Sequence, residues 1–402
     1  MRPRAWSALA LLGFGSGLPL ILTDSTLKAW LKDAHVDLAT IGFFALVQLP
    51  YNLKFLWAPL LDRFELPFLG RRRGWLLGTQ ALLAALLAVM AFRDPGGHLS
   101  LVAGLAFGIA FVSASQDTVT DAWRTEFLPP HQQAMGTAVH VTAYRIGILA
   151  AGAGALVLAD RAGWRMAYLA MAVLMLLSLL GTLLAEEPAD ARPPKSLAEA
   201  VVEPFRAFLT RPGAWAALAF IVLYKVGDQL ASSLTVPYFM ETGYSKSAIG
   251  LMTKGVGLAA LIAGGFISGW WMEKWPLKRG LLVCGIFQVG STLSLLLPAF
   301  LGPKLSVLGV SLALENLGYG MGVTVYMTLI MRLCDRSYTA TQFALLTSLA
   351  ALSRSLLASP AGEVAKHTGW PVFFLICAVI ALPGLLMLTR YDRWGVPEED
   401  AA

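Results

Sequence analysis

The sequence predicts an all-α membrane protein with twelve transmembrane helices, arranged as two six-helix halves. Of its 402 residues, 57% are hydrophobic and only 14% are charged, whereas a soluble domain has about 25% charged residues. The apolar residues come in repeated blocks of about 20, which is the length of helix that crosses a bilayer. The longest hydrophilic stretch, residues 186–212, falls near the middle of the chain and separates six blocks from six.

The expected spans follow these apolar blocks. They cover residues 6–30, 40–61, 75–92, 100–122, 135–159, 164–184, 213–239, 247–271, 280–300, 305–331, 340–363 and 370–389. The chain then divides into an N-terminal half (1–185), a cytoplasmic linker (186–212) and a C-terminal half (213–402). No small-residue cleavage site closes the first block, so we expect an uncleaved first helix. Its segment Gly15-Ser16-Gly17-Leu18-Pro19 is the best candidate for a hinged or broken helix.

Two features of the sequence predict the structure of the linker and the orientation of the chain in the membrane. Ser196-Leu197-Ala198-Glu199 has the pattern of a capping box and predicts a short amphipathic helix that runs to Leu209. With the N-terminus placed inside, eighteen Lys and Arg residues fall in inside segments and seven in outside segments. By the positive-inside rule, both termini are expected in the cytoplasm.

The two halves repeat one another. Thr40-Ile41-Gly42 and Ala248-Ile249-Gly250 stand 208 residues apart, and Gly163-Trp164 and Gly369-Trp370 stand 206 apart. Arg145 and Arg354 follow at an offset of 209. Such an offset indicates duplication, as in transporters of the major facilitator type, whose two halves are parallel repeats around a central site. The predicted fold is therefore the major facilitator fold.

Several other classes of protein are disfavoured. The three cysteines, Cys284, Cys334 and Cys377, lie far apart with no metal-binding spacing. The sequence has no G-x-S-x-G, no H-E-x-x-H and no phosphate loop. We expect no cofactor, no metal and no nucleic-acid partner, because the net charge of +6 reflects loops on one side of a membrane. A polytopic enzyme or a receptor stays a minor alternative.

Charged residues inside the expected spans are the main functional signal, because a charge in a bilayer is costly and normally faces a cavity or a partner. Asp117 and Asp121 are four apart, on one face of a helix. We expect Asp117 to carry the coupling proton, with Asp121, Glu315 and Asp228 as rivals. A purely structural pairing of these acids with nearby bases is the alternative.

A second group of polar residues in the spans is expected to bind the substrate. Basic side chains suit an anionic substrate, and aromatic and amide groups suit sugar-like ones. The candidates are Lys225, Lys254, Arg145, Arg354, Lys54, Gln48, Tyr51, Asn52, Gln116, Tyr144, Asn316 and Tyr319. Lys225 and Asp228 are three apart and share one face of their helix, so Lys225 is also a candidate structural partner of that acid.

A charged loop after the second expected span resembles the signature loop of the major facilitator superfamily. Asp62-Arg63 ends the span and Gly70-Arg71-Arg72-Arg73 follows, with Glu65 to Leu69 as extra residues. Asp62 at a helix end can accept hydrogen bonds from a neighbouring helix terminus and from arginine side chains. We expect Asp62, Arg63, Arg71 and Arg72 to act in gating, with plain positive-inside anchoring as the alternative.

Longer blocks of sequence resemble the AmpG-type muropeptide permeases, of the peptide–acetyl-coenzyme A transporter family. The blocks are Ser16-Gly17-Leu18-Pro19-Leu20, Lys54-Phe55-Leu56-Trp57-Ala58-Pro59-Leu60-Leu61-Asp62-Arg63, Ser113-Ala114-Ser115-Gln116-Asp117, Tyr224-Lys225-Val226-Gly227-Asp228, Glu315-Asn316-Leu317 and Ala340-Thr341-Gln342-Phe343. They come in order and cover nearly the whole chain. Some relatives carry two further C-terminal helices.

The resemblance implies a cargo that the charges alone do not. Such permeases carry anhydromuropeptides, N-acetylglucosaminyl-1,6-anhydro-N-acetylmuramic acid with or without its peptide, from periplasm to cytoplasm across the bacterial inner membrane. It also implies proton symport, a role in peptidoglycan recycling and, in some bacteria, β-lactamase induction. We expect a monomer surrounded by membrane lipid. Another anionic cargo of the same family, such as acetyl-coenzyme A, is the alternative.

Overall fold

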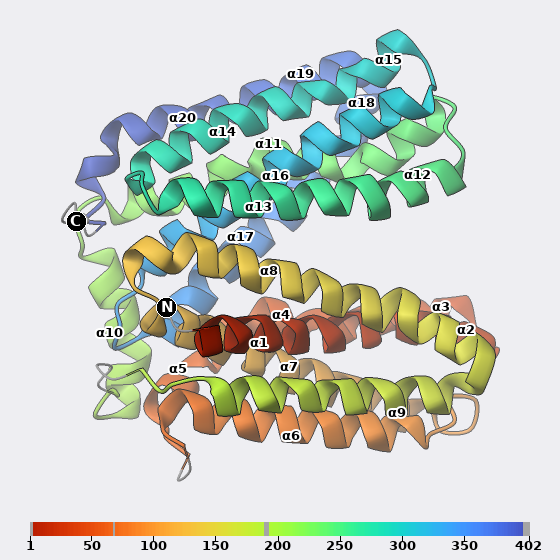
Figure 1. The fold of residues 1–402 in the computed structure, drawn as a ribbon, viewed down its shortest axis with the longest axis vertical. Helices are drawn as coiled ribbons and strands as arrows, with labels where there is room; N and C mark the ends of the chain where they lie inside the picture. Colours follow the sequence, from red (N-terminus) through yellow and green to blue (C-terminus); the bar gives the residue numbers. More distant parts are fainter. Residues whose placement is uncertain (1–2, 67–68, 189–192, 397–402) are drawn as a thin grey trace. The chain divides into compact units, whose positions relative to one another are not determined.

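The computed structural model describes residues 3–66, 69–188 and 193–396, and within these ranges the chain is helical with no strand. Residues 67–68 of the inserted 65–69 segment, together with Arg192 of the linker, lie outside the described residues. The chain forms two compact units (Figure 1), which are described separately below. Unit 1 comprises Met1–Leu128, Val139–Phe205 and Cys334–Ser348, and unit 2 comprises Pro129–Ala138, Arg206–Leu333 and Leu349–Ala402.

Unit 1 is built mainly from the first half of the sequence. Its helices are α1 (Pro3–Leu22), α2 (Ser25–Asp33), α3 (Leu38–Phe43), η1 (Phe44–Gln48), α4 (Leu49–Leu53), η2 (Lys54–Leu56), α5 (Ala58–Arg63), α6 (Arg71–Ala91), α7 (Leu99–Phe127), most of α8 (Gln133–Leu149), the π-helical turn η4 (Ala150–Gly154), α9 (Ala155–Leu184), the start of α10 (Leu197–Leu209) and the start of α17 (Thr339–Ala358). In its core α1 packs on α7 and α9, and α6 packs on α7 and α9.

The glycines of α1 serve close packing, and α1 is not broken at residues 15–19. The helix continues through Pro19 to Leu22 and is interrupted only afterwards. A Cβ on Gly17 would lie 2.2 Å from the carbonyl oxygen of Tyr144, and one on Gly15 would lie 2.3 Å from Cβ of Ser178. Small residues let membrane helices approach this closely.

The second expected span, residues 40–61, is broken where a single helix was predicted. It consists of five short pieces, from α3 to α5, with 3₁₀ turns at η1 and η2. Pro50 and Pro59 lie at the starts of α4 and α5, where the missing backbone N–H costs nothing. Lys54 therefore sits in a 3₁₀ turn.

Unit 2 is built mainly from the second half of the sequence. Its helices are η3 (Pro130–Gln132), α11 (Ala214–Glu241), α12 (Lys246–Met252), the π-helical turn η5 (Thr253–Gly257), α13 (Leu258–Met272), α14 (Leu277–Leu293), η6 (Ser294–Leu296), α15 (Leu297–Leu301), α16 (Leu305–Leu333), α18 (Ala361–Thr368), α19 (Trp370–Ile380), α20 (Leu382–Met387) and η7 (Leu388–Arg393). In this unit α16 packs on α13 and α14, and α19 packs on α11 and α14.

The predicted repeat is present in local structure. Gly163 and Gly369 have nearly the same backbone conformation, with φ/ψ of 83°/162° and 75°/162°. In each repeat the tryptophan after this glycine donates its Nε1–H to an acidic side chain. The two acids stand 208 residues apart in the sequence. Trp164 donates to Asp33 at 2.9 Å and Trp370 donates to Glu241 at 2.8 Å. The two halves therefore share conformation and contacts as well as sequence.

Both repeats also begin a helix with the same kind of cap. Asp37 accepts a hydrogen bond from the backbone N–H of Thr40 at 2.9 Å, and Ser245 accepts one from that of Ala248 at 3.2 Å. Each side chain thus satisfies one of the free N–H groups of a helix start. The two caps, like the acids above, stand 208 residues apart.

The predicted linker helix is α10, and one of the two bonds of its capping box is formed. The N–H of Glu199 donates to Ser196 Oγ at 3.1 Å, whereas the Glu199 carboxylate accepts from the N–H of Lys195, one residue before the expected donor, at 2.8 Å. The middle of α10 is tied to the first turn of α17, because the Gln342 side chain donates to the Pro204 carbonyl at 3.0 Å.

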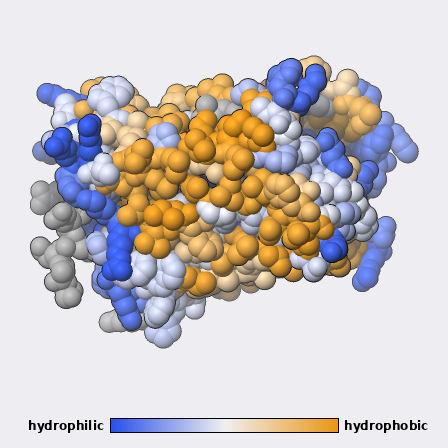
Figure 2. All heavy atoms as spheres, turned by 90° about the horizontal axis from the view of Figure 1, so that it is seen from above, coloured by the Kyte–Doolittle hydropathy of each residue, from blue (hydrophilic) through white to orange (hydrophobic). Residues whose placement is uncertain are grey.

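Among the described residues, eight helical stretches are long and apolar enough to cross a membrane. One of them, Pro130–Leu184, contains the non-helical Gly163 and is two helices in sequence. Twelve spans stay a prediction, consistent with this fold. Figure 2 shows a face of the molecule on which a broad apolar region separates polar ends. Exposed apolar residues such as Ile286 and Val379 suit contact with lipid.

Candidate functional site

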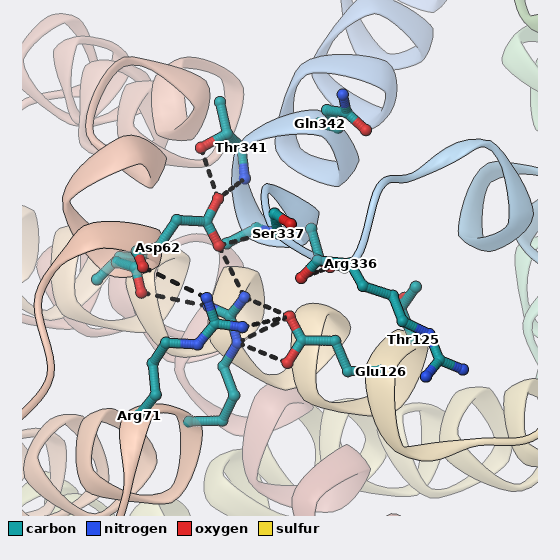
Figure 3. A network of polar contacts seen from close by, with 12 residues as sticks. Asp62, Arg71, Thr125, Glu126, Arg336, Ser337, Thr341 and Gln342 are labelled. Carbon is teal, nitrogen blue, oxygen red and sulfur yellow. Dashed lines mark hydrogen bonds and ion pairs between the residues drawn. The ribbon is translucent and has the colours of Figure 1, made fainter. Parts of the chain in front are cut away.

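An ionic network joins three helices of unit 1 (Figure 3). The guanidinium of Arg72, which is fully buried, donates to Asp62 Oδ1 at 2.7 Å and to the Glu126 carboxylate, with Nε–Oε2 at 3.1 Å. Arg71 donates to the same Glu126 at 3.0 Å. Two arginines thus face two acids, so the buried charges are balanced, as burial requires.

Asp62 also caps the start of α17. Its Oδ2 accepts from the backbone N–H of Thr341 at 2.8 Å and from the Thr341 hydroxyl at 2.7 Å, and its Oδ1 accepts from the N–H of Ala340 at 3.2 Å. A carboxylate at a helix N-terminus is stabilised by the free N–H groups and by the helix dipole. This carboxylate therefore holds a segment from the second half of the sequence inside unit 1.

The other predicted gating residue, Arg63, lies outside this network. Its guanidinium stacks on the ring of Phe64, with Cζ 5.7 Å from the ring centroid. Two acids that the sequence analysis did not single out take part instead. Glu126 pairs with both arginines, and Glu187 accepts from the backbone N–H groups of Arg72 and Arg73 at 2.7 and 3.0 Å. The sequence carried no signal for these pairings, because the acids lie 54 and 115 residues after Arg72.

The predicted pair Asp117 and Asp121 lies in a polar cluster on α7, which we call the unit 1 cluster. Asp121 is held from both sides. Its Oδ1 accepts from Arg124 at 3.0 Å, while its Oδ2 lies 3.9 Å from the Lys54 ammonium. The Arg124 side chain is only 3% exposed, against 12% for Lys54. Arg124 was not among the predicted site residues.

Asp117 is less well satisfied than Asp121. Its Oδ1 is buried and has no hydrogen-bond partner among the described residues. The same is true of the hydroxyls of Ser16 on α1 and Ser113 on α7, and of both amide atoms of Gln116. Buried polar groups are normally hydrogen-bonded, so such a concentration marks a place prepared for a polar ligand.

The other predicted substrate residues of unit 1 are spread along two segments. Gln48 donates to Thr23 Oγ1 at 3.2 Å. The Tyr51 hydroxyl is buried without a hydrogen-bond partner among the described residues and lies within electrostatic range of Asp117. Asn52 is exposed. Tyr144 and Arg145 lie on α8, both partly buried.

A second polar cluster, the unit 2 cluster, joins α11 and α16. Lys225 and Asp228 are buried and form an ion pair on α11, with Nζ–Oδ2 at 3.2 Å. Glu315 of α16 lies within electrostatic range of both and accepts from the amide of Asn316 at 2.8 Å. The structure thus brings together four of the predicted site residues.

Further groups surround Lys225. Its ammonium lies 4.7 Å from the centroid of the Tyr319 ring, within the range of a cation–π interaction. Both amide atoms of Gln288 are buried without partners among the described residues. A small cavity of about 10 Å³ is lined by Asp228, Gln288 and Tyr224, together with neighbouring apolar residues. A space of this size holds about one water molecule.

Two predicted substrate residues lie apart from both clusters. Lys254 is in the π-helical turn η5 and Arg354 is in the later part of α17, and both are exposed. Of the five predicted substrate-binding bases, Lys54 and Lys225 form ion pairs with acids of the expected spans.

The sequence of this chain is similar to those of known membrane transporters. The profile of the Major Facilitator Superfamily matches residues 6–358. The chain belongs to this superfamily. It is 45% identical over 390 residues, 96% of this chain and 79% of the relative, to a protein of Escherichia coli (strain K12) named anhydromuropeptide permease. It is also 33% identical over 394 residues, 95% of each chain, to a protein of Rickettsia felis named putative transporter AmpG 4. Within the superfamily it belongs with the AmpG-type permeases.

Solved structures share the fold at low sequence identity. The E. coli fucose:proton symporter FucP superposes with a TM-score of 0.71 at 15% identity, over 96% of this chain and 98% of that chain. The proton:xylose symporter XylE gives 0.70 at 11% identity, over 98% and 96%. The predicted major facilitator fold is confirmed, and the chain is a multi-pass membrane protein and a secondary transporter of a small-molecule substrate.

Proposed function

We propose that this transporter imports anhydromuropeptides from the periplasm to the cytoplasm by proton symport, for cell-wall recycling. In this proposal it is an inner-membrane monomer with both termini in the cytoplasm, and its halves are divided by the 186–212 linker. The similarity to the E. coli permease, 45% over 96% of the chain, carries the choice of cargo. The basic residues in the loops support the orientation.

The two polar clusters support an anionic, sugar-containing cargo. The peptide stem of an anhydromuropeptide carries carboxylates, and the proposal assigns them to cations such as Lys225 and Lys54. Amide and aromatic groups beside these cations, such as Gln116 and Tyr319, suit hydroxyl and N-acetyl groups of the sugars. Ligand sites of this kind combine a few placed polar groups with aromatic walls.

Proton coupling is assigned to Asp117. A coupling acid must bind its proton facing one side of the membrane and release it facing the other. Asp117 has a buried oxygen without a partner among the described residues, and a lysine and a second acid lie within electrostatic range. Asp228 and Glu315 are already grouped with Lys225. They remain the alternative proton site.

The ionic network around Asp62 supports a gating role for that residue and for Arg71 and Arg72. Asp62 caps the start of α17 with three hydrogen bonds, and Arg72 donates to its Oδ1 while Arg71 contacts the same network through Glu126. In the proposal this cap acts as a latch, because its release frees the first turn of α17. Arg63 stacks on Phe64, and no contact of it with the network is found among the described residues.

The test is uptake of labelled anhydromuropeptide into proteoliposomes, with an acid-outside pH gradient imposed or collapsed. We expect accumulation that depends on the gradient and is competed by unlabelled anhydro-disaccharide. Accumulation that ignores the gradient would contradict symport. No uptake by protein that is folded, as judged by thermal unfolding, would contradict the cargo. Acetyl-coenzyme A, the alternative cargo, is then tested in the same vesicles, since a carrier of it should ignore anhydro-sugars.

A further inference from the structure

The charges of the unit 1 cluster do not balance in every protonation state. The cluster holds two cations, Lys54 and Arg124, and two acids, Asp117 and Asp121. With both acids ionised, the cluster is neutral. With a proton on Asp117, it carries two cations and one anion. A buried, uncompensated cation is costly and attracts an anion strongly, because the surroundings screen charge poorly.

The two cations are not equivalent, and the geometry says which one is spare. Arg124 lies one turn from Asp121 on the same helix, is 3% exposed and donates to it at 3.0 Å. Lys54 approaches the other oxygen only to 3.9 Å. It comes from a different segment, the 3₁₀ turn η2, on a flexible side chain. Asp121 therefore keeps Arg124, and Lys54 is the cation that can change partner.

Lys54 has a second acid within reach. Asp117 lies one helical turn before Asp121 on the same face of α7, so the two carboxylates are neighbours. Lys54 is the strongest charged influence on Asp117. An ammonium on a four-carbon chain can move between two such neighbours, whereas a guanidinium fixed to one of them cannot.

We propose that Lys54 is the binding group for a substrate carboxylate in unit 1, and that it becomes available only when Asp117 holds a proton. When Asp117 ionises, Lys54 pairs with it and the substrate carboxylate loses its partner. Proton and anion thus bind together and leave together. This inference rests on the proposed symport of an anionic cargo and deepens it.

The other groups that face the pair do not compensate Lys54 near neutral pH. Tyr51 of α4 lies in electrostatic range of Asp117 and of Tyr144 on α8, and both phenols are uncharged there. Ser16 of α1 faces Asp117 and has no charge. His140 of α8 faces Arg124, and as a base it supplies no negative charge. Among these described groups, only an ionised Asp117 offers Lys54 an anion of its own.

The exchange of partners breaks one bond, the O–H bond of the Asp117 carboxyl group. Its proton passes to water on the side of lower proton concentration, and Asp117 becomes a carboxylate. Lys54 stays an ammonium throughout and moves from the substrate carboxylate to Asp117. The occupied cluster and the empty cluster then both have a net charge of zero.

The first test needs no substrate. Thermal unfolding of the purified full-length protein is measured for Lys54→Gln, Asp117→Asn and the double variant at pH 5.5 and pH 8. We expect the shifts in Tm to be non-additive by about 3 °C or more at pH 8, where the pair exists, and additive at pH 5.5. The matched control is the partly buried pair Asp24 and Lys28, at the N-cap and in the first turn of α2, which meet as an i,i+4 ion pair. The Tm coupling of this control pair should be the same at pH 5.5 and at pH 8.

The second test measures binding of anhydromuropeptide with a free or an amidated peptide carboxylate. Wild type should bind the free acid about tenfold more weakly at pH 8 than at pH 5.5, and Asp117→Asn should remove that difference. Lys54→Gln should weaken the free acid about tenfold and leave the amide unchanged. If Lys54→Gln does not fold, Lys54→Arg serves, with pH-dependent binding retained.

The two tests separate this inference from the cargo. A Tm coupling that is the same at pH 5.5 and pH 8, in protein that shows gradient-driven uptake, would overturn the partner exchange and leave the transport proposal standing. A pH-dependent coupling in protein that binds no anhydromuropeptide would contradict the cargo and support the role of Lys54. Equal losses of affinity for the free acid and for the amide in Lys54→Gln would also overturn the partner exchange.

Discussion

The unit 1 and unit 2 clusters each contain a local ion pair but differ in net charge, because with every acid ionised the first is neutral and the second carries one excess negative charge. Each contains an acid and a base three residues apart on one long helix, Asp121 with Arg124 on α7 and Lys225 with Asp228 on α11. Each adds a charged side chain from another segment, a lysine in unit 1 and Glu315 in unit 2. A proton therefore leaves the first cluster with a spare cation, whereas it makes the second cluster neutral.

The two pairs are not copies of one another, because the repeat offset of about 208 residues relates α7 to α16 and not to α11. The local i,i+3 pair is fixed by helical periodicity in both halves. The other charges come from positions whose surroundings depend on packing. A cluster that gains an excess base when it is protonated suits the binding of an anion together with a proton. A cluster with an excess acid suits a proton site or a cation held in place, so mutations in the two clusters are expected to have different effects.

The largest effect is expected from neutralising Asp117. Asp117→Asn keeps the unit 1 cluster in the charge state of the protonated acid, so uphill accumulation should fall to background while substrate exchange across the vesicle membrane persists. Uptake with and without a pH gradient, alongside counterflow, is the measurement. The matched variant in the other cluster, Glu315→Gln, should keep part of the gradient-driven uptake. The reverse result would place the coupling proton in unit 2 and break the comparison.

Removing the only base of the unit 2 cluster should cost stability. Lys225→Ala leaves Asp228 and Glu315 buried without a cation, and breaking a buried pair typically costs about 3–5 kcal/mol. The melting temperature in detergent is the measurement. Adding Asp228→Asn to Lys225→Ala should restore much of the lost melting temperature. If Lys225→Ala instead unfolds like wild type but binds peptide-bearing ligand less well than the free disaccharide, Lys225 is a substrate group and not a structural partner.

The charged loops of the two halves allow a third comparison. In unit 1, Arg72 takes part in the ionic network, whereas in the corresponding loop of unit 2, Lys274 and Arg279 lie over tryptophan rings, 5.0 and 4.4 Å from the centroids. Asp62→Asn should lower the free energy of unfolding by about 2 kcal/mol, because charged hydrogen bonds to Arg72 and α17 are lost.

The control for that variant is Arg63→Gln, since Arg63 lies in the same loop and stacks only on Phe64. We expect it to unfold within about 0.5 kcal/mol of wild type. Hydrogen exchange of the first turn of α17 provides a local readout, and Asp62→Asn should speed it. Equal stability of the two variants would show that the network is not what holds α17.

The smallest effect concerns the two matched helix caps, Asp37 and Ser245. Hydrogen bonds from Thr40 hold the pKa of Asp37 below its ordinary value. A lowered pKa in the folded state adds stability above the ordinary value, and this is lost as the pH falls through the folded value. Hydrogen exchange at the start of α3 should therefore rise below about pH 4 relative to that at the start of α12, after correction for intrinsic rates. If hydrogen exchange at the two caps changes equally with pH, the stabilising role of the ionised Asp37 is contradicted.

Local features were predictable because each depends on near neighbours in the chain. The Ser196 bond at the start of α10 and the matched glycines at 163 and 369 are examples, and both were found. No break is present at residues 15–19, because glycine also permits close packing, and sequence does not distinguish the two uses. The breaks in residues 40–61 were missed although Pro50 and Pro59 are visible, since proline is tolerated in membrane helices.

The sequence by itself determined the fold class, the repeat and which residues carry charge inside the apolar blocks, because period, length and hydropathy are properties of short windows. Tertiary structure alone decided which charges meet across helices. Thr341 donates to an acid 279 residues earlier, and Glu126 meets an arginine 54 residues before it. Such pairings depend on which helices pack together. The position of Lys54 against Asp121, with Asp117 one turn away, depends on the same packing.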